Sequence, residues 1–305
     1  MNLELAVLLA LGVAAINGGT SVLDRIVLSK GSGVQNISTL VFFSAGVSGV
    51  LGIIVVPLFT NISFDLSQMQ FAAVLAAGLL QVLPLPFYFM AVERSNATRI
   101  LPLTSTSHII VVFGAFLFLG EKLSLTGYIG VGLLVLGAVI LTSQQSTGKY
   151  KLSYGALLAI LATVLFGAKS LAMKFALNNM GTGTMIFYTH LFAGVFALLA
   201  LGWSNPREEV VSIVKGGSKG VLPAFVGQEL LSGVASLLRP LSYSLALVSV
   251  ASPITGVLPA FSFIFILLLG KVGYSVEDFS REEIVINVLS LAIITVGLLT
   301  IVLFR

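Results

Sequence analysis

No cysteine occurs among the 305 residues of the chain, which excludes a disulfide, a thiolate metal ligand and a cysteine nucleophile. Charged residues are also scarce: they make up 9% of the sequence, whereas an ordinary soluble domain carries roughly 25%. Apolar residues account for 57% of the chain, and the mean hydropathy is +1.08. Water is therefore not the main solvent of this chain, and the apolar runs leave no room for a separate soluble domain.

The sequence also lacks the short motifs of several enzyme classes. It contains no HExxH zinc motif, no phosphate-binding P-loop, no GxSxG nucleophile elbow and no EF-hand loop. We therefore expect no enzyme activity, no cofactor and no resident metal. The net charge of +4 comes almost entirely from lysines and arginines between the apolar runs, which argues against a nucleic-acid surface.

The chain consists instead of a series of apolar runs, each near the ~20 residues that a membrane-spanning helix needs. Helices satisfy their backbone hydrogen bonds internally, as hydrocarbon requires, and no alternating pattern of barrel strands is present. The sequence thus predicts an all-α polytopic membrane protein with ten transmembrane helices. We place them at about residues 3–24, 38–60, 69–92, 99–120, 124–143, 153–177, 183–203, 221–247, 251–270 and 284–304.

An internal repeat divides the chain near residue 148. Residues 17–21 (NGGTS) correspond to residues 166–170 (FGAKS) at an offset of 149. Each half, residues 1–148 and residues 149–305, holds five predicted helices. Because five is an odd number, the two halves must run in opposite directions across the membrane. Inverted repeats of this kind are common in secondary transporters, whose binding sites lie near the repeat interface.

Four segments of the first half carry a resemblance to a known family: residues 91–97 (AVERSNA), 119–124 (LGEKLS), 127–130 (GYIG) and 136–140 (LGAVI). Together they resemble the EamA-type half of the drug/metabolite transporter superfamily, and the five-plus-five organisation extends the likeness along the chain. The resemblance implies alternating access around a central cavity lined by helices of both halves. The second half departs from the pattern, because Lys271 stands where the first half has Glu121.

Three charged residues, Lys169, Glu229 and Arg239, fall well inside predicted helices, where such a residue costs roughly 2.5–3.5 kcal/mol on insertion scales. A rise of ~1.5 Å per residue places Lys169, Arg239 and His190 in one layer, about 10–12 Å below the same face. A layer of this kind suits a carboxylate or a phosphate, so these three residues are candidate substrate-binding groups. In the alternative interpretation, Lys169 and Arg239 extend along their flexible stems to the nearer interface.

Other buried polar residues are candidates for coupling or for lining the cavity. Glu229 lies ten residues before Arg239, a rise of about 15 Å, so its partner must come from another helix. A buried carboxyl can exchange a proton, and Glu229 is therefore a coupling candidate; a structural, hydrogen-bonded acid is the alternative. His108 is a second candidate for coupling and for binding, with a plain interhelical hydrogen bond as its alternative. Weaker candidates for the lining are Asn17, Gln81, Tyr188 and Gln228.

These observations lead to one expected function and three rivals. We expect a secondary transporter that moves a small organic metabolite, bearing a carboxylate or phosphate, by alternating access. The rival within transport is an exporter of neutral or aromatic amino acids or drugs, which would use Asn17, Gln81 and Tyr188. The rivals from other classes are an intramembrane enzyme that uses Glu229 or His108 on a lipid-linked substrate, and a receptor or scaffold that transports nothing.

The expected partners are a small-molecule substrate and the lipid bilayer, in the plasma or inner membrane, and the architecture is compatible with a homodimer. Two signals disagree on orientation. Loops on the face away from both chain ends carry eleven basic residues, against three on the other face, which by the positive-inside rule puts both ends outside. The family resemblance implies instead that both ends are inside, so these two predictions stand opposed.

Overall fold

The structure is a computed structural model, and it describes residues 2–29, 37–94, 104, 106–143, 154–200, 222–271 and 280–303. Within these ranges every regular element is an α-helix. The helices are α1 (Leu3–Ser29), α2 (Ile37–Phe59), α3 (Gln68–Val82), α4 (Pro84–Arg94), α6 (Ser107–Phe118), α7 (Leu125–Ser143), α8 (Tyr154–Asn179), α9 (Thr182–Ala200), α11 (Leu222–Leu245), α12 (Val248–Thr255), α13 (Leu258–Lys271) and α14 (Arg281–Leu303).

These helices group into the ten predicted spans. Seven segments of the described chain are long and apolar enough to cross a membrane, with α3–α4 and α12–α13 each counted as one segment. Two shorter apolar helices, α6 and α7, and the more polar α11 bring the number to ten. The prediction of an all-α, multi-pass membrane protein is confirmed. The structure covers the predicted fourth span only from Thr104 onward, and residues 99–103 lie outside the described part.

Two predicted spans are interrupted by prolines. The span near 69–92 divides at Leu83, because Pro84 has no amide hydrogen and begins the next helix, α4. The span near 251–270 starts earlier, at Val248, and divides at residues 256–257 into α12 and α13. Both breaks lie inside the bundle, where neighbouring side chains can satisfy freed backbone groups.

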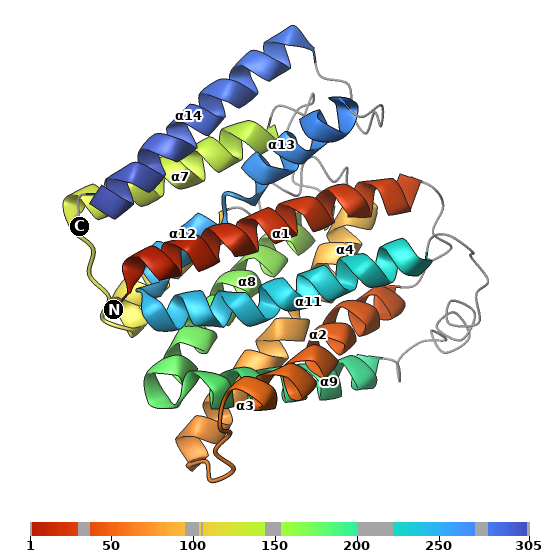
Figure 1. Ribbon diagram of the computed structural model, residues 1–305, viewed down its shortest axis with the longest axis vertical. Helices are drawn as coiled ribbons and strands as arrows, with labels where there is room; N and C mark the ends of the chain where they lie inside the picture. The colour runs from red at the N-terminus through yellow and green to blue at the C-terminus, as the bar shows by residue number, and fades with distance from the viewer. Residues whose placement is uncertain are drawn as a thin grey trace.

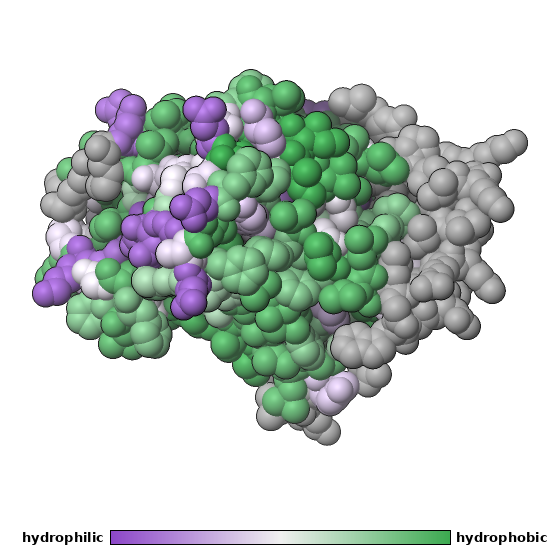
Figure 2. Space-filling view, turned by 90° about the horizontal axis from the view of Figure 1, so that it is seen from below, coloured by the Kyte–Doolittle hydropathy of each residue, from purple (hydrophilic) through white to green (hydrophobic). Residues whose placement is uncertain are grey.

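The outer surface is largely apolar, as a bilayer requires. Large apolar side chains such as Phe113, Leu117, Val285 and Leu299 are exposed on the outer faces of their helices. Figure 2 shows a broad hydrophobic surface, with the hydrophilic residues gathered toward one end of the visible face. An exposed apolar surface of this extent fits lipid rather than water.

Helices that are distant in sequence pack side by side. In Figure 1, α1 lies along α11, and α7 pairs with α14 at one edge of the molecule. The beginning of α1 and the end of α14 lie toward the same end of the bundle. Gly49 lies at the crossing of α2 and α9. A Cβ atom there would lie 3.0 Å from Cα of Gly194 and 3.0 Å from the carbonyl oxygen of His190, so a larger side chain would push the two helices apart.

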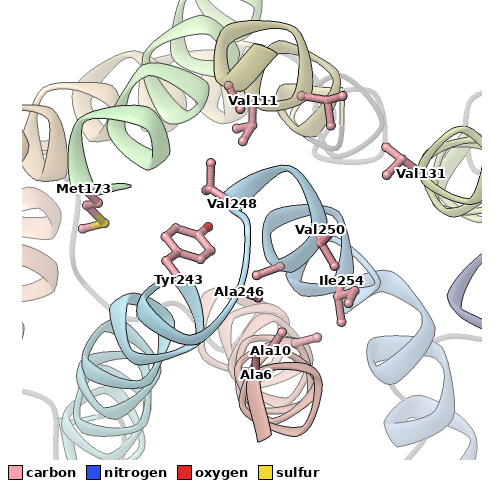
Figure 3. Close-up of a cluster of buried hydrophobic side chains, with 14 of the residues drawn as sticks. Ala6, Ala10, Val111, Val131, Met173, Tyr243, Ala246, Val248, Val250 and Ile254 are labelled. Atoms are coloured by element: carbon pink, nitrogen blue, oxygen red, sulfur yellow. The ribbon is translucent and has the colours of Figure 1, made fainter. Parts of the chain in front are cut away.

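A tightly packed apolar cluster fills the bundle where α11 ends and α12 begins. Figure 3 shows the ring of Tyr243 at the end of α11, with Met173 of α8 on one side and Val248 of α12 on the other. Ala6 and Ala10 of α1 pack beneath them, and all five side chains are at most 1% exposed. We call these five residues the apolar plug. It lies on the side of the bundle where α1 begins.

Candidate functional site

A polar cavity of about 130 Å³ lies inside the helical bundle. Side chains from α1, α2, α3, α4, α8 and α11 form its wall, so both halves of the sequence contribute. The lining residues are Asn17, Ser44, Ala45, Ser48, Gln81, Leu85, Lys169, Met173, Ser232, Ser236 and Arg239. Met173 belongs to both the wall and the apolar plug, so the plug adjoins the cavity on the side toward the beginning of α1.

Lys169 and Arg239 both line this central cavity, as the predicted common layer requires. Neither makes a hydrogen bond or an ion pair with another residue that the structure describes, and the Nε atom of Arg239 is fully buried. None of the described residues that line the cavity is acidic. Because a buried charge without a counter-charge is costly, these two basic side chains have the chemistry to pair with an anionic group.

His190 lies one side chain behind the cavity wall. It is completely buried on α9, and its Nδ1 atom donates to the carbonyl oxygen of Ile186 at 2.8 Å. Its Nε2 atom lies 3.0 Å from Oγ of Ser236, which lines the cavity. Ser236 also donates to the carbonyl oxygen of Gly233 at 2.6 Å. The structure therefore links His190 to the cavity through a serine and gives it no direct place in the lining.

The four weaker lining candidates divide into two pairs. Asn17 and Gln81 line the cavity, and Oε1 of Gln81 is buried with no hydrogen-bond partner among the described residues. Tyr188 and Gln228 do not contribute to the lining. The ring of Tyr188 stacks on Phe192 at a centroid distance of 6.3 Å, within a group of aromatic side chains on α9.

Glu229 obtains its partner from another helix, as its distance from Arg239 predicts. Oγ of Ser44 on α2 donates to Oε1 of Glu229 at 2.8 Å, and Ser44 lines the central cavity. The carboxylate itself is 4% exposed and lies at the interface of α2 and α11. One hydroxyl group thus joins the buried acid to the cavity wall.

His108 forms an interhelical hydrogen bond away from the cavity. Its Nδ1 atom lies 2.9 Å from Oγ of Ser252, which joins α6 to α12. The ring also fills the space beside Gly256, directly at the break between α12 and α13. The contact is the interhelical hydrogen bond that was the alternative to a coupling role for this histidine.

Sequence reasoning missed the role of Lys174. This residue follows the cavity-lining turn of α8 and was counted with the basic residues of the loops. In the structure its Nζ atom donates to the carbonyl oxygens of Tyr243 at 2.7 Å and Ala246 at 2.8 Å. Those carbonyl groups end α11, where the helix dipole places partial negative charge, so Lys174 satisfies the helix terminus electrostatically.

Glu121 performs the opposite task at the start of the next helix. Its carboxylate accepts from the backbone amides of Val248 at 3.0 Å and Ser249 at 2.9 Å, and from Oγ of Ser249 at 2.6 Å. The preceding Gly120 has a left-handed φ of +66°, and this turn directs Glu121 toward α12. Lys174 and Glu121 together hold what we call the α11–α12 junction, residues 245–249. The only sequence signal was the LGEK segment that ends α6.

Comparison with known proteins agrees with this architecture. A solved crystal structure, described only as that of a protein, superposes on 99% of this chain and 98% of its own length with a TM-score of 0.73; at 17% identity, the likeness is one of fold. A Sinorhizobium protein described as an uncharacterized transporter in the cobO 3' region is 41% identical over 54 residues, which are 18% of this chain and 38% of the relative. The match thus spans well under half of that relative.

The family match covers the first half of the chain. Residues 4–143 match the EamA-like transporter family. This range contains the four segments on which the resemblance to the drug/metabolite transporter superfamily depends, together with α1 to α7. Over these residues, a little under half of the chain, the protein is similar to the EamA-like transporter family.

Proposed function

We propose that this protein is a secondary transporter that moves a small anionic metabolite across the membrane by alternating access. One observation carries the proposal. Lys169 and Arg239 line the same small cavity in the middle of the bundle, and neither has a partner of opposite charge among the described residues. Intramembrane charges are expensive and mark substrate paths. A carboxylate or a phosphate in the cavity would supply the missing counter-charge.

The contacts between helices support two inverted halves. If α8 repeats α1, then the packing of α1 on α11 and α13 should recur as the packing of α8 on α3–α4 and α6, and both sets of contacts are present. The remaining main contacts, α2 with α9 and α7 with α14, join equivalent helices of the two halves. This exchange of partners is the pattern expected of an inverted repeat, in which the cavity lies between the two copies.

Alternating access requires that one end of the cavity open when the other closes. The apolar plug closes the end nearest to the beginning of α1, and the α11–α12 junction holds Tyr243 in that plug. Opening this end would separate Tyr243 and Met173. The cavity would then be reached from the side on which α1 begins and α14 ends.

The experiment is a transport assay with purified protein in liposomes. We expect counterflow of small carboxylates or phosphates, together with a higher apparent melting temperature when the same anions are added to the protein in detergent. Uptake of neutral or aromatic amino acids in place of anions would support the rival exporter. Of the three residues assigned to that rival, Asn17 and Gln81 line the cavity and Tyr188 does not.

Glu229 is the residue we assign to coupling with protons. Its contact with Ser44 gives a change in its protonation a direct route to the cavity wall. Glu229→Gln retains an oxygen that accepts from Ser44 but cannot release a proton. We expect this variant to bind and exchange substrate while losing accumulation driven by a pH gradient. Accumulation equal to that of the unaltered protein would show that Glu229 is a structural acid.

A further inference from the structure

A buried amide in the cavity wall carries unused hydrogen-bonding capacity. Gln81, on the last turn of α3, is 7% exposed and lines the cavity. Its Oε1 atom is buried and has no hydrogen-bond partner among the described residues. A buried acceptor without a donor is unfavourable, so a ligand that supplies a donor at this place gains binding free energy.

The two basic residues of the cavity wall lie on one side of it. Lys169 and Arg239 both come from the second half of the chain, whereas the uncharged polar residues come from both halves: Asn17, Ser44, Ser48 and Gln81 from the first, and Ser232 and Ser236 from the second. Among the residues that the structure describes, the Nε–H group of Arg239 has no acceptor and Oε1 of Gln81 has no donor. A complementary ligand therefore has an acceptor-rich, anionic end toward α8 and α11 and a donor toward α3.

The charge of the cavity wall limits which donor group the ligand can present to Gln81. Among the described residues, the cavity is lined by two basic side chains and by no acidic one. In a cavity this small, a ligand ammonium group could not move away from the two cations, and both would repel it. A hydroxyl group donates to Gln81 without this penalty. The volume of about 130 Å³ is roughly ten times the ~10–15 Å³ that one water needs, so the ligand is small.

From these observations we propose that the cavity selects a small hydroxylated anion, a hydroxycarboxylate or a hydroxylated phosphate ester, and that Gln81 is the residue that recognises the hydroxyl group. This inference rests on the proposed transport of an anion. It adds that removal of one hydroxyl from the substrate weakens binding, although the anionic group is untouched. We expect a loss of about tenfold, the factor that corresponds to ~1.4 kcal/mol.

The test compares matched pairs of anions that differ by one hydroxyl group. The pairs are lactate and propionate, malate and succinate, and 3-hydroxypropyl phosphate and propyl phosphate. Dissociation constants are measured by isothermal titration on the full-length protein in detergent. For at least one pair we expect the unaltered protein to bind the hydroxylated member about tenfold more tightly. Equal binding within every pair that binds would overturn the inference.

Variants assign the preference to Gln81. In Gln81→Leu we expect the preference to vanish, with the deoxy anion bound as in the unaltered protein. Gln68→Leu, at an exposed position on the same helix, is the matched control and should keep the preference. Gln81→Met, which retains the length of the side chain, is measured as well. A preference that persists in both Gln81 variants contradicts recognition by Gln81.

The same measurements distinguish failure of the inference from failure of the proposed function. If no anion of any pair binds the unaltered protein, the transport of anions is itself wrong. If anions bind, and the Lys169→Met variant loses them, but hydroxylated and deoxy members bind alike, then only the role of Gln81 is wrong.

Discussion

Two places with buried charged residues, both within the described part of the chain, treat their charges in opposite ways. At the α11–α12 junction, Lys174 donates to two carbonyl groups at the end of one helix, and Glu121 accepts from two amides at the start of the next. In the central cavity, about one helical turn away along α8, Lys169 and Arg239 have no such partners among the described residues. Charges whose hydrogen bonds are all made within the protein indicate a structural role. The charges of the cavity, which have no such partners, indicate a ligand.

This difference separates stability from function. A charge satisfied by helix ends contributes to folding, because its removal leaves those ends unpaired. A charge that faces the cavity without a partner among the described residues is desolvated without compensation, and its removal should not lower stability. Substitutions in the two regions should therefore move different observables.

The largest effect is expected from the cavity. Arg239→Gln and Lys169→Met should each lower transport by about tenfold or more, because a charge-assisted hydrogen bond contributes ~1.5–3 kcal/mol. Uptake into liposomes measures the change, with the amount of protein in the membrane as the control. The apparent melting temperature should stay the same or rise. Normal uptake kinetics in both variants would remove these cations from the site.

A moderate effect on stability is expected from the junction. Lys174→Met leaves the carbonyl groups of Tyr243 and Ala246 unpaired, and Glu121→Gln turns an amide donor toward the backbone of α12. Each should lower the free energy of unfolding by about 1–3 kcal/mol. Thermal unfolding in detergent measures this loss. Lys122→Met, an exposed neighbour of Glu121, is the matched control and should be neutral. A junction variant that lost anion affinity at unchanged stability would contradict the comparison.

The smallest effect is expected at His108, which lies between these two cases as a neutral group with one partner. His108→Phe removes the hydrogen bond to Ser252 and should cost about 0.6 kcal/mol, the average for interhelical hydrogen bonds in membranes. Ser252→Ala removes the same bond from the other side. Thermal unfolding of the double variant should show no further loss, since the two singles delete one interaction. A large loss of pH-dependent transport in His108→Phe would restore its coupling role.

The positions of the spans followed from the sequence, because apolar runs near twenty residues have few other uses. The interruptions at Pro84 and at Gly256 did not, since a proline in a membrane helix can kink or break it according to its neighbours. Depth along the helix was also predictable: a constant rise per residue placed Lys169 and Arg239 at one level, and both line one cavity.

The direction of a side chain around its helix was harder to predict. In a membrane the lipid-facing and protein-facing sides are both apolar, so hydropathy gives little information about which side is which. For this reason Tyr188 and Gln228 were expected in the lining that Asn17 and Gln81 occupy. The partners of Lys174 and Glu121 lie some 70 and 130 residues away in the chain, and local sequence patterns do not predict contacts over such separations.

The contact between His190 and Ser236 has a consequence for where one proton can reside. Nδ1 of His190 must carry hydrogen, because the carbonyl oxygen of Ile186 can only accept. If the imidazole is neutral, Nε2 accepts, and the single hydroxyl hydrogen of Ser236 must point at the ring and leave Gly233. If the imidazole is charged, Nε2 donates, and the hydroxyl hydrogen turns back to Gly233. The serine hydroxyl in the cavity wall therefore rotates with the charge of a histidine that never touches the cavity.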